Sequence, residues 1–83
     1  MSITLQIPNE IAQALRLPPQ EHEHQLLIEL AVALYAREML TFGKARELAG
    51  MSKYDFGRLL SQRSVPRHYH QADLDDDLAY ANS

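Results

Sequence analysis

Cysteine is absent from the 83 residues of the sequence, and its absence removes two common sources of stability for a small protein. Without thiols the chain forms neither disulfide bonds nor thiolate zinc sites. A chain of this length is one domain, near the size at which a single hydrophobic core is only marginally sufficient. We therefore expect a homodimer or a higher homo-oligomer to supply further stability. The lack of cysteine also agrees with a reducing cytoplasm, which is the location we expect.

Long hydrophobic runs are missing too. The longest apolar-rich run covers residues 26–36, contains Glu29 and is too short to cross a bilayer. No signal peptide is visible at the start of the sequence. We therefore expect no contact with a membrane.

The residue patterns that support catalysis are also absent. No serine or cysteine nucleophile has a partnered histidine, and there is no glycine-rich phosphate loop. Two His-x-His pairs, His22 with His24 and His68 with His70, do not predict a metal site. Side chains two positions apart do not share a helix face, and zinc needs three or four converging ligands. We expect no catalytic residues, metal, cofactor or small-molecule substrate, so the protein is not predicted to be an enzyme.

What the sequence does contain is a pattern of two short helices in residues 41–63. Thr41 is suited to cap the first helix, and Gly50 is suited to end it in the left-handed conformation. Ser52 is suited to cap a second helix directly after it, with Asp55 in the position that answers the cap in a capping box. Two helices that cross steeply over a tight turn would bury the apolar side chains of Ala45, Ala49, Met51, Phe56 and Leu59.

This helical pair resembles the DNA-binding helix-turn-helix, which has a glycine in its turn and small residues in its first helix. The outer face of the second helix carries Lys53 and Arg58, which are the expected anchors for phosphate or guanine. Gly57 lies on the same face. The residues predicted to contact DNA are Lys44, Ser52, Lys53, Tyr54, Arg58, Ser61 and Arg63.

Two observations favour a different interpretation of the pair. Helical hairpins with a glycine turn occur in many folds as packing units or protein docking elements, with no nucleic acid involved. In addition, Arg46 occupies a first-helix position that usually holds a small residue. We expect either looser docking of the helices or an Arg46 side chain that extends to solvent along its aliphatic stem.

The charged side chains are segregated along the sequence, although the net charge is only −3. Residues 1–36 carry one basic and four acidic side chains, residues 37–67 carry seven basic and three acidic ones, and residues 68–83 carry four aspartates and no lysine or arginine. The helical pair is therefore a basic island in an otherwise acidic protein. DNA binding needs such an island, although many charge clusters are only solvated faces.

The region before the helical pair predicts a strand and two further helices. Residues 2–7 alternate polar and apolar, which predicts a short strand paired with a second copy or with a partner protein, or else an extended segment lying on the helices. A short helix capped by Asn9 is expected over residues 10–16, and a long one from about residue 20 to residue 40. The long helix is apolar on much of its girth, so it is the central buried element or lies partly in an interface. The dimer forms through either the strand or this helix.

The predicted fold is mainly α, with a short N-terminal β-strand followed by a helical bundle that contains the helix-turn-helix. Residues 1–70 form this single domain, and residues 71–83 form an acidic C-terminal tail. Leu74 and Leu78 are one helical turn apart, and aspartates crowd the start of the segment, so it is suited to form a turn or two of helix against a partner. Its expected partner-binding residues are Asp73, Leu74, Asp75, Asp76, Asp77, Leu78 and Tyr80; the alternative is a solubilising tail.

Nearly the whole chain resembles the UPF0175 family of small prokaryotic proteins, through the opening ITLQIP, the run LLIELAVALYARE, the specific segment GKARELAGMSKYDF and the tail DLDDDL. Family members usually have a second alanine in place of Arg46 and a glycine in place of Ser64. Several members resemble antitoxins encoded beside a small toxin, often a nuclease. The resemblance thus implies a DNA-binding antitoxin that represses its own operon and neutralises a nuclease toxin through its tail. The alternatives are a protein-interaction adaptor or a plain transcriptional regulator without a toxin.

Overall fold

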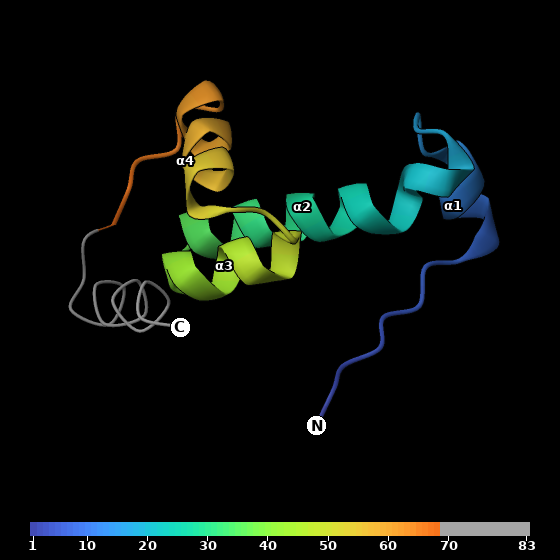
Figure 1. Cartoon of the computed structure of the whole chain (residues 1–83). Helices are drawn as coiled ribbons and strands as arrows, with labels where there is room; N and C mark the ends of the chain where they lie inside the picture. Colours follow the sequence, from blue (N-terminus) through green and yellow to red (C-terminus); the bar gives the residue numbers. More distant parts are fainter. Residues whose placement is uncertain (69–83) are drawn as a thin grey trace.

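The computed structural model of the chain describes residues 1–68, which are predominantly helical. Helices α2 and α3 lie side by side, α4 stands steeply against them, and α1 lies at the far end of α2 (Figure 1). The elements in order are α1 (Asn9–Ala14), the 3-10 turn η1 (Pro19–Glu21), α2 (His22–Ala36), α3 (Phe42–Ala49) and α4 (Lys53–Gln62). The predicted mainly helical class is confirmed.

The hydrophobic core lies where α2, α3 and α4 meet. The ring of Tyr35 makes edge-on contacts with Phe42 and Phe56 at centroid distances of 5.9 and 6.2 Å, and the two phenylalanine rings are 5.5 Å apart. Such aromatic pairs contribute about 0.5–1.5 kcal/mol each beyond the area they bury. Because each helix supplies one ring, the cluster fixes all three helices together. The buried apolar residues are Ile28, Ala31, Val32, Tyr35, Phe42, Ala45, Ala49, Phe56 and Leu60.

The long helix α2 is shorter than predicted at both ends. It begins at His22 after η1, and it ends at Ala36. Beyond that end, Glu38 has a φ of 60° and its backbone N–H donates to the Tyr35 carbonyl, while the Met39 N–H donates to the Leu34 carbonyl. These two bonds form a Schellman motif, which satisfies the last carbonyls and turns the chain toward α3.

The same motif ends α3 and α4. Gly50, with a φ of 68°, follows α3, and the Met51 N–H donates to the Arg46 carbonyl at 3.0 Å. Ser64, with a φ of 56°, follows α4, and the Val65 N–H donates to the carbonyl of Leu60 at 2.8 Å. The predicted left-handed Gly50 is confirmed. At Ser64 the same conformation is adopted by a residue with a Cβ atom, at a steric cost.

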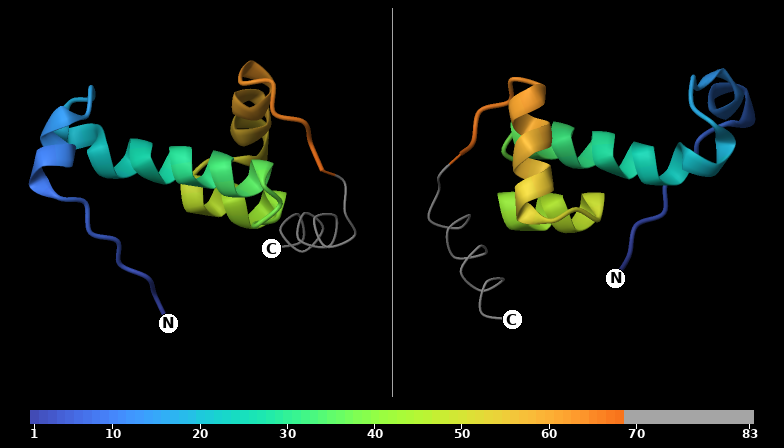
Figure 2. Two further views of the ribbon diagram at one scale, coloured as in Figure 1. Left: turned by 180° about the vertical axis from the view of Figure 1, so that it is seen from behind. Right: turned by 45° about the horizontal axis from the view of Figure 1, so that its top comes forward.

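The predicted N-terminal strand is absent from the described part of the chain. Residues 1–8, here called the arm, extend away from α1 with no segment beside them in Figure 1 or in either view of Figure 2. A single chain forms no strand here, since a strand needs a second strand for its ladder and residues 9–68 provide none. The predicted pairing with a second copy or a partner protein stays a prediction. The alternative, a segment lying on the helices, is wrong, because every residue of the arm is exposed.

At the other end of the arm, Asn9 is the first residue of α1 and Pro8 takes the cap position, so the predicted Asn9 cap is also wrong.

No helix within residues 1–68 is long and apolar enough to cross a bilayer. The predicted acidic tail, with its partner-binding residues from Asp73 to Tyr80, lies outside the described residues, as does His70.

Candidate nucleic-acid interface

Two side-chain caps fix the starts of α3 and α4. The Thr41 hydroxyl accepts a hydrogen bond from the backbone N–H of Lys44 at 3.3 Å, and the Ser52 hydroxyl accepts one from the backbone N–H of Asp55 at 3.0 Å. Both predicted caps are confirmed. Each is worth about 1 kcal/mol of helix stability, so the turn between the helices is well determined by local sequence.

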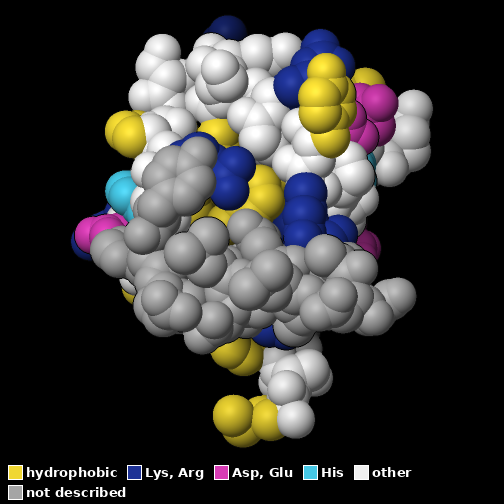
Figure 3. All heavy atoms as spheres, turned by 60° about the vertical axis from the view of Figure 1, so that its left-hand side comes forward, with side chains coloured by type: hydrophobic (Ala, Val, Ile, Leu, Met, Phe, Trp, Pro, Cys, Tyr) yellow, Lys and Arg dark blue, Asp and Glu magenta, His cyan; other side chains and the backbone are white. Residues whose placement is uncertain are grey.

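A stripe of exposed side chains runs along α4. Tyr54, Arg58 and Ser61 are exposed and are spaced four and three residues apart, which places them on one helix face. The guanidinium of Arg58 lies 5.8 Å from the centre of the Tyr54 ring, a cation–π contact, and the tyrosine is 73% exposed. Figure 3 shows the side of the molecule that carries α4, where Lys and Arg side chains surround hydrophobic ones.

The two predicted lysines occupy different surroundings. Lys44 on α3 is exposed, and its ammonium lies 3.2 Å from the Glu47 carboxylate one helical turn away. An exposed pair of this kind is worth under about 1 kcal/mol, so Lys44 can exchange its partner for a phosphate. Lys53, the first residue of α4, is half-buried.

Arg63 belongs to the contact between α4 and α2. Its two terminal nitrogens donate to the two carboxylate oxygens of Glu29, each at 2.6 Å, in a bidentate ion pair. The hydrogen bonds from Arg63 lower the pKa of the Glu29 carboxyl, and the same bonds raise the pKa of the guanidinium. Arg63 is therefore not part of the exposed stripe on α4. Its ion pair with Glu29 holds that helix against α2.

Arg46 braces the turn from inside. It is only 8% exposed, and its Nη1 donates to the carbonyl oxygen of Met51 at 2.9 Å. The expectation that this side chain extends to solvent is wrong, because the guanidinium reaches a carbonyl in the turn that α3 and α4 share. A small residue at this position would leave that carbonyl without its donor.

Residues 65–68 form a strap over the aromatic core, and sequence patterns did not indicate it. The Arg67 guanidinium lies 3.7 Å from the centre of the Phe42 ring. The backbone N–H of His68 donates to the hydroxyl oxygen of Tyr35, and the imidazole lies 3.9 Å from the carboxylate of Glu38. The strap connects α4 to the start of the C-terminal tail. Its one proline, Pro66, breaks helices but does not by itself indicate contacts with the core.

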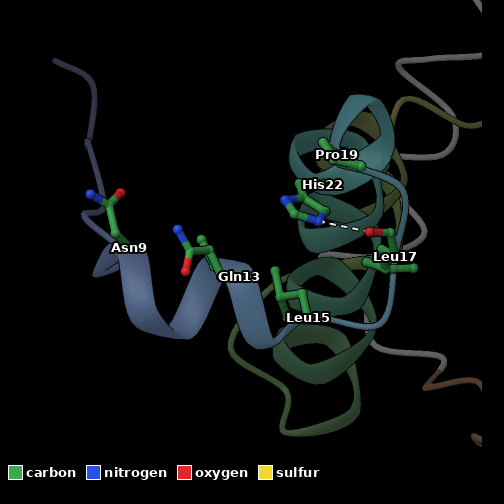
Figure 4. A pocket seen from close by; sticks show the side chains of 7 residues that line it. Asn9, Gln13, Leu15, Leu17, Pro19 and His22 are labelled. Carbon is green, nitrogen blue, oxygen red and sulfur yellow. Dashed lines mark hydrogen bonds between the residues drawn. The ribbon is translucent and has the colours of Figure 1, made fainter.

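Two open pockets flank these elements. One of about 220 Å³ lies along α4, lined by Met51, Asp55, Arg58, Leu59 and Gln62. The other, of about 350 Å³, lies between α1 and the start of α2. His22 lines it, and its Nε2 donates to the Leu17 carbonyl oxygen at 3.0 Å (Figure 4). Within residues 1–68, no three histidine, aspartate or glutamate side chains are grouped as a metal site requires.

Comparison with known proteins gives the family. The profile of the Uncharacterised protein family (UPF0175) matches residues 1–83. The chain belongs to the UPF0175 family. A UPF0175 protein of Aeropyrum pernix is 44% identical over 72 residues, which cover 87% of this chain and 81% of that relative. A UPF0175 protein of Archaeoglobus fulgidus is 33% identical over 76 residues, which cover 92% and 85%.

A third UPF0175 protein, from Synechocystis, is 29% identical over 80 residues, covering 96% of this chain and 85% of the relative. No solved structure matches the chain. The UPF0175 match spans the arm, the helical pair and the tail, so the resemblance inferred from the sequence is confirmed over its full extent.

Proposed function

We propose that this UPF0175 protein binds duplex DNA through α4 and represses transcription of its own operon. The observation that carries the proposal is the exposed stripe of Tyr54, Arg58 and Ser61 on α4, a helix that stands steeply against α2 and α3 and is fixed at both ends (Figure 1). Arg58 is suited to donate two hydrogen bonds to guanine or to a phosphate, and the Tyr54 hydroxyl is suited to donate to a phosphate.

The surroundings of the stripe support this role. The cap at Ser52 and the Arg63 pair with Glu29 hold both ends of α4, so the helix can enter a groove as a rigid element. Lys44 on α3 and Lys53 at the start of α4 add positive charge, within the basic island of residues 37–67. A homodimer would present two copies of α4 to a palindromic site with half-sites about one DNA turn apart.

We further propose that the protein is an antitoxin without catalytic activity of its own, and that its acidic tail binds a small nuclease toxin. Four aspartates and two leucines in residues 73–78 suit the basic substrate groove of a nuclease. Affinity purification of tagged full-length protein beside a version ending at Tyr69 tests this part. We expect a small nuclease-like protein with the full chain and its loss with the truncation; recovery of no such protein by either version contradicts it.

Fluorescence anisotropy with the DNA upstream of the gene tests the DNA-binding part. Arg58→Ala is expected to lower the affinity by about tenfold or more and to reduce the salt dependence by about one counterion. The matched control is Arg16→Ala, which removes the same charge from an exposed position beyond α1. Equal affinity for upstream and scrambled DNA contradicts autorepression. If Lys53→Glu combined with Arg58→Glu leaves every function intact, the protein is an interaction adaptor and α4 is only architecture.

A further inference from the structure

Exposed apolar side chains are concentrated in and beside the arm. Among the described residues, seven large hydrophobic side chains are exposed, and five of them lie within residues 1–11: Met1, Ile3, Leu5, Ile7 and Ile11. Ile3 is 84% exposed and Leu5 is 70% exposed. Within residues 1–68, the backbone groups of residues 1–7 make no hydrogen bond. Residues 1–7 of the arm therefore form an extended segment that has an apolar side and backbone donors and acceptors without hydrogen bonds within residues 1–68.

We propose that two copies of this chain dimerise by pairing their arms as antiparallel strands about a two-fold axis at Leu5. An antiparallel pair needs no long connection, and a two-fold axis lets one surface serve both copies. The inference deepens the proposed function, since it names the interface that would place two copies of α4 on a palindromic site.

The alternation of side chains is compatible with an axis at Leu5. With the axis at Leu5, each leucine faces the other, and Ile3 of one copy faces Ile7 of the second copy. All six apolar side chains then lie on one face, while Thr4 and Gln6 face each other across the opposite side. Moving the axis by half a residue places apolar side chains opposite polar ones, because the side-chain period of a strand is two.

Pro8 is compatible with the same register. Opposed residues in an antiparallel pair alternate between hydrogen-bonded and non-hydrogen-bonded positions. If Leu5 faces its copy in a hydrogen-bonded pair, then Ile3 with Ile7 is also hydrogen-bonded, and Ser2 with Pro8 is not. The proline, which has no N–H to donate, thus costs the ladder nothing at its end.

Charge favours a second copy over other occupants. Residues 1–9 contain no lysine, arginine, aspartate or glutamate. Two identical arms therefore meet without the like-charge contacts that destabilise opposed strands, and DNA finds no side-chain cation to bind. A two-stranded ribbon needs cover for its apolar face. The exposed Ile11 and the half-buried Leu26, Leu27 and Leu30 of α2 offer apolar surface for such cover.

A charge placed on the axis tests the proposal by sedimentation equilibrium of the full chain. Leu5→Glu sets two carboxylates opposite each other on the apolar face, and it is expected to raise the dimer dissociation constant by about 100-fold or more. Thr4→Glu, the matched control, puts the same charge on the polar face opposite Gln6 and is expected to change the constant less than about threefold. Since residues 1–7 lie outside the helices, both variants should keep the far-UV spectrum of the wild type. A monomeric wild type, or an unchanged dimer in Leu5→Glu, overturns the proposal.

Cross-linking tests the register, because the chain has no cysteine of its own. Leu5→Cys places two thiols across the axis, about 5.5 Å apart between Cα atoms, within reach of a disulfide. In Ile3→Cys the two thiols are offset by four residues, about 14 Å, and should not link. Mixing Ile3→Cys with Ile7→Cys should give the mixed disulfide dimer. Equal linking of Leu5→Cys and Ile3→Cys overturns the register.

The proposal of dimerisation through the arm and the proposal of DNA binding through α4 can be refuted separately. Arg58→Ala leaves the arm intact, so a dimer that has lost DNA affinity supports both proposals. A dimer broken by Leu5→Glu in a protein whose wild type binds no DNA supports the arm and contradicts the DNA-binding function. A wild type that is monomeric alone and pairs its arm only with a toxin overturns the arm proposal while leaving α4 as the DNA-binding element.

Discussion

Replacing Glu29 and Arg63, singly and together, measures how firmly α4 is held against α2. We choose Glu29→Gln and Arg63→Gln, which remove the charges and keep polar side chains of similar reach. Gln25 also donates to the Glu29 carboxylate, at 2.8 Å, so a single replacement of Glu29 disturbs two contacts. A double-mutant cycle removes the contribution of Gln25 and leaves the coupling between Glu29 and Arg63.

The expected coupling follows from the geometry of the pair. Two parallel hydrogen bonds of 2.6 Å are close to the ideal bidentate arrangement, which favours a strong interaction. The side chains of Arg63 and Glu29 are 34% and 48% exposed, however, so water and salt screen the charges. A well-aligned pair at that exposure is worth about 1 kcal/mol, the upper end of the range for surface pairs. In a domain of this size, that free energy corresponds to roughly 4–8 °C in Tm.

Urea denaturation followed by far-UV circular dichroism, repeated across pH 3 to 8, is the assay. Because Arg63 lowers the pKa of Glu29, the stabilisation is complete above the carboxyl's usual value of 4.5 and is lost as the pH falls through the lower folded-state pKa. In Glu29→Gln this part of the acid dependence should vanish. A coupling below about 0.2 kcal/mol, or an acid dependence unchanged by the replacement, refutes the assignment of Arg63 to helix packing.

Four further predictions concern stability and use the same assay at neutral pH. Ser64→Gly is expected to stabilise the protein by about 0.5–1 kcal/mol, because Ser64 holds a left-handed conformation that glycine adopts without strain. Gly50→Ala, at a φ of 68°, should destabilise by about 1 kcal/mol for the same reason. Gly57→Ala is expected to stabilise by up to about 1 kcal/mol, since a Cβ there meets only the Arg67 side chain, at 3.9 Å. Phe56→Ala should cost about 3–5 kcal/mol, enough to unfold a marginal domain.

Each of these predictions has a clear contrary result. A neutral or destabilising Ser64→Gly, together with a neutral Gly50→Ala, would mean that the left-handed positions do not limit stability. A destabilising Gly57→Ala would point to strain between α4 and the strap. A Phe56→Ala variant that is folded and as stable as the wild type would contradict the conclusion that the aromatic cluster is the centre of the core.

Local signals predicted the helical pair well. Capping hydroxyls at Thr41 and Ser52 and the glycine at position 50 act within three or four residues, so sequence alone located the start of each helix and the turn. The geometry of two helices that cross over a tight turn likewise predicted that Ala45, Ala49 and Phe56 are buried. Met51 and Leu59, predicted with them, are half-buried.

Features that depend on the folded chain were not predictable in this way. The left-handed conformation at Glu38 is indicated by no local preference, so the end of α2 was predicted four residues too late. The pairing of Arg63 with Glu29 joins positions 34 residues apart, and nothing in the sequence distinguished Arg63 from a surface arginine that meets DNA. The burial of Arg46 was also not predicted. Its guanidinium is buried because it donates to the Met51 carbonyl, and that carbonyl is in reach only once the turn between α3 and α4 has folded.

The aromatic core is built from helices that follow one another directly in the chain. This arrangement determines whether a chain folds before or after it associates with a second chain. Short connections bring α2 to α3 and α3 to α4, so most contacts are local and folding should take microseconds to milliseconds, as in other small helical proteins. Association of two chains at about 1 µM takes roughly 0.1–10 s at typical rate constants. Each newly made chain should therefore complete its three-helix core alone. If two chains pair through their arms as proposed, they meet as finished domains whose arms are still unoccupied.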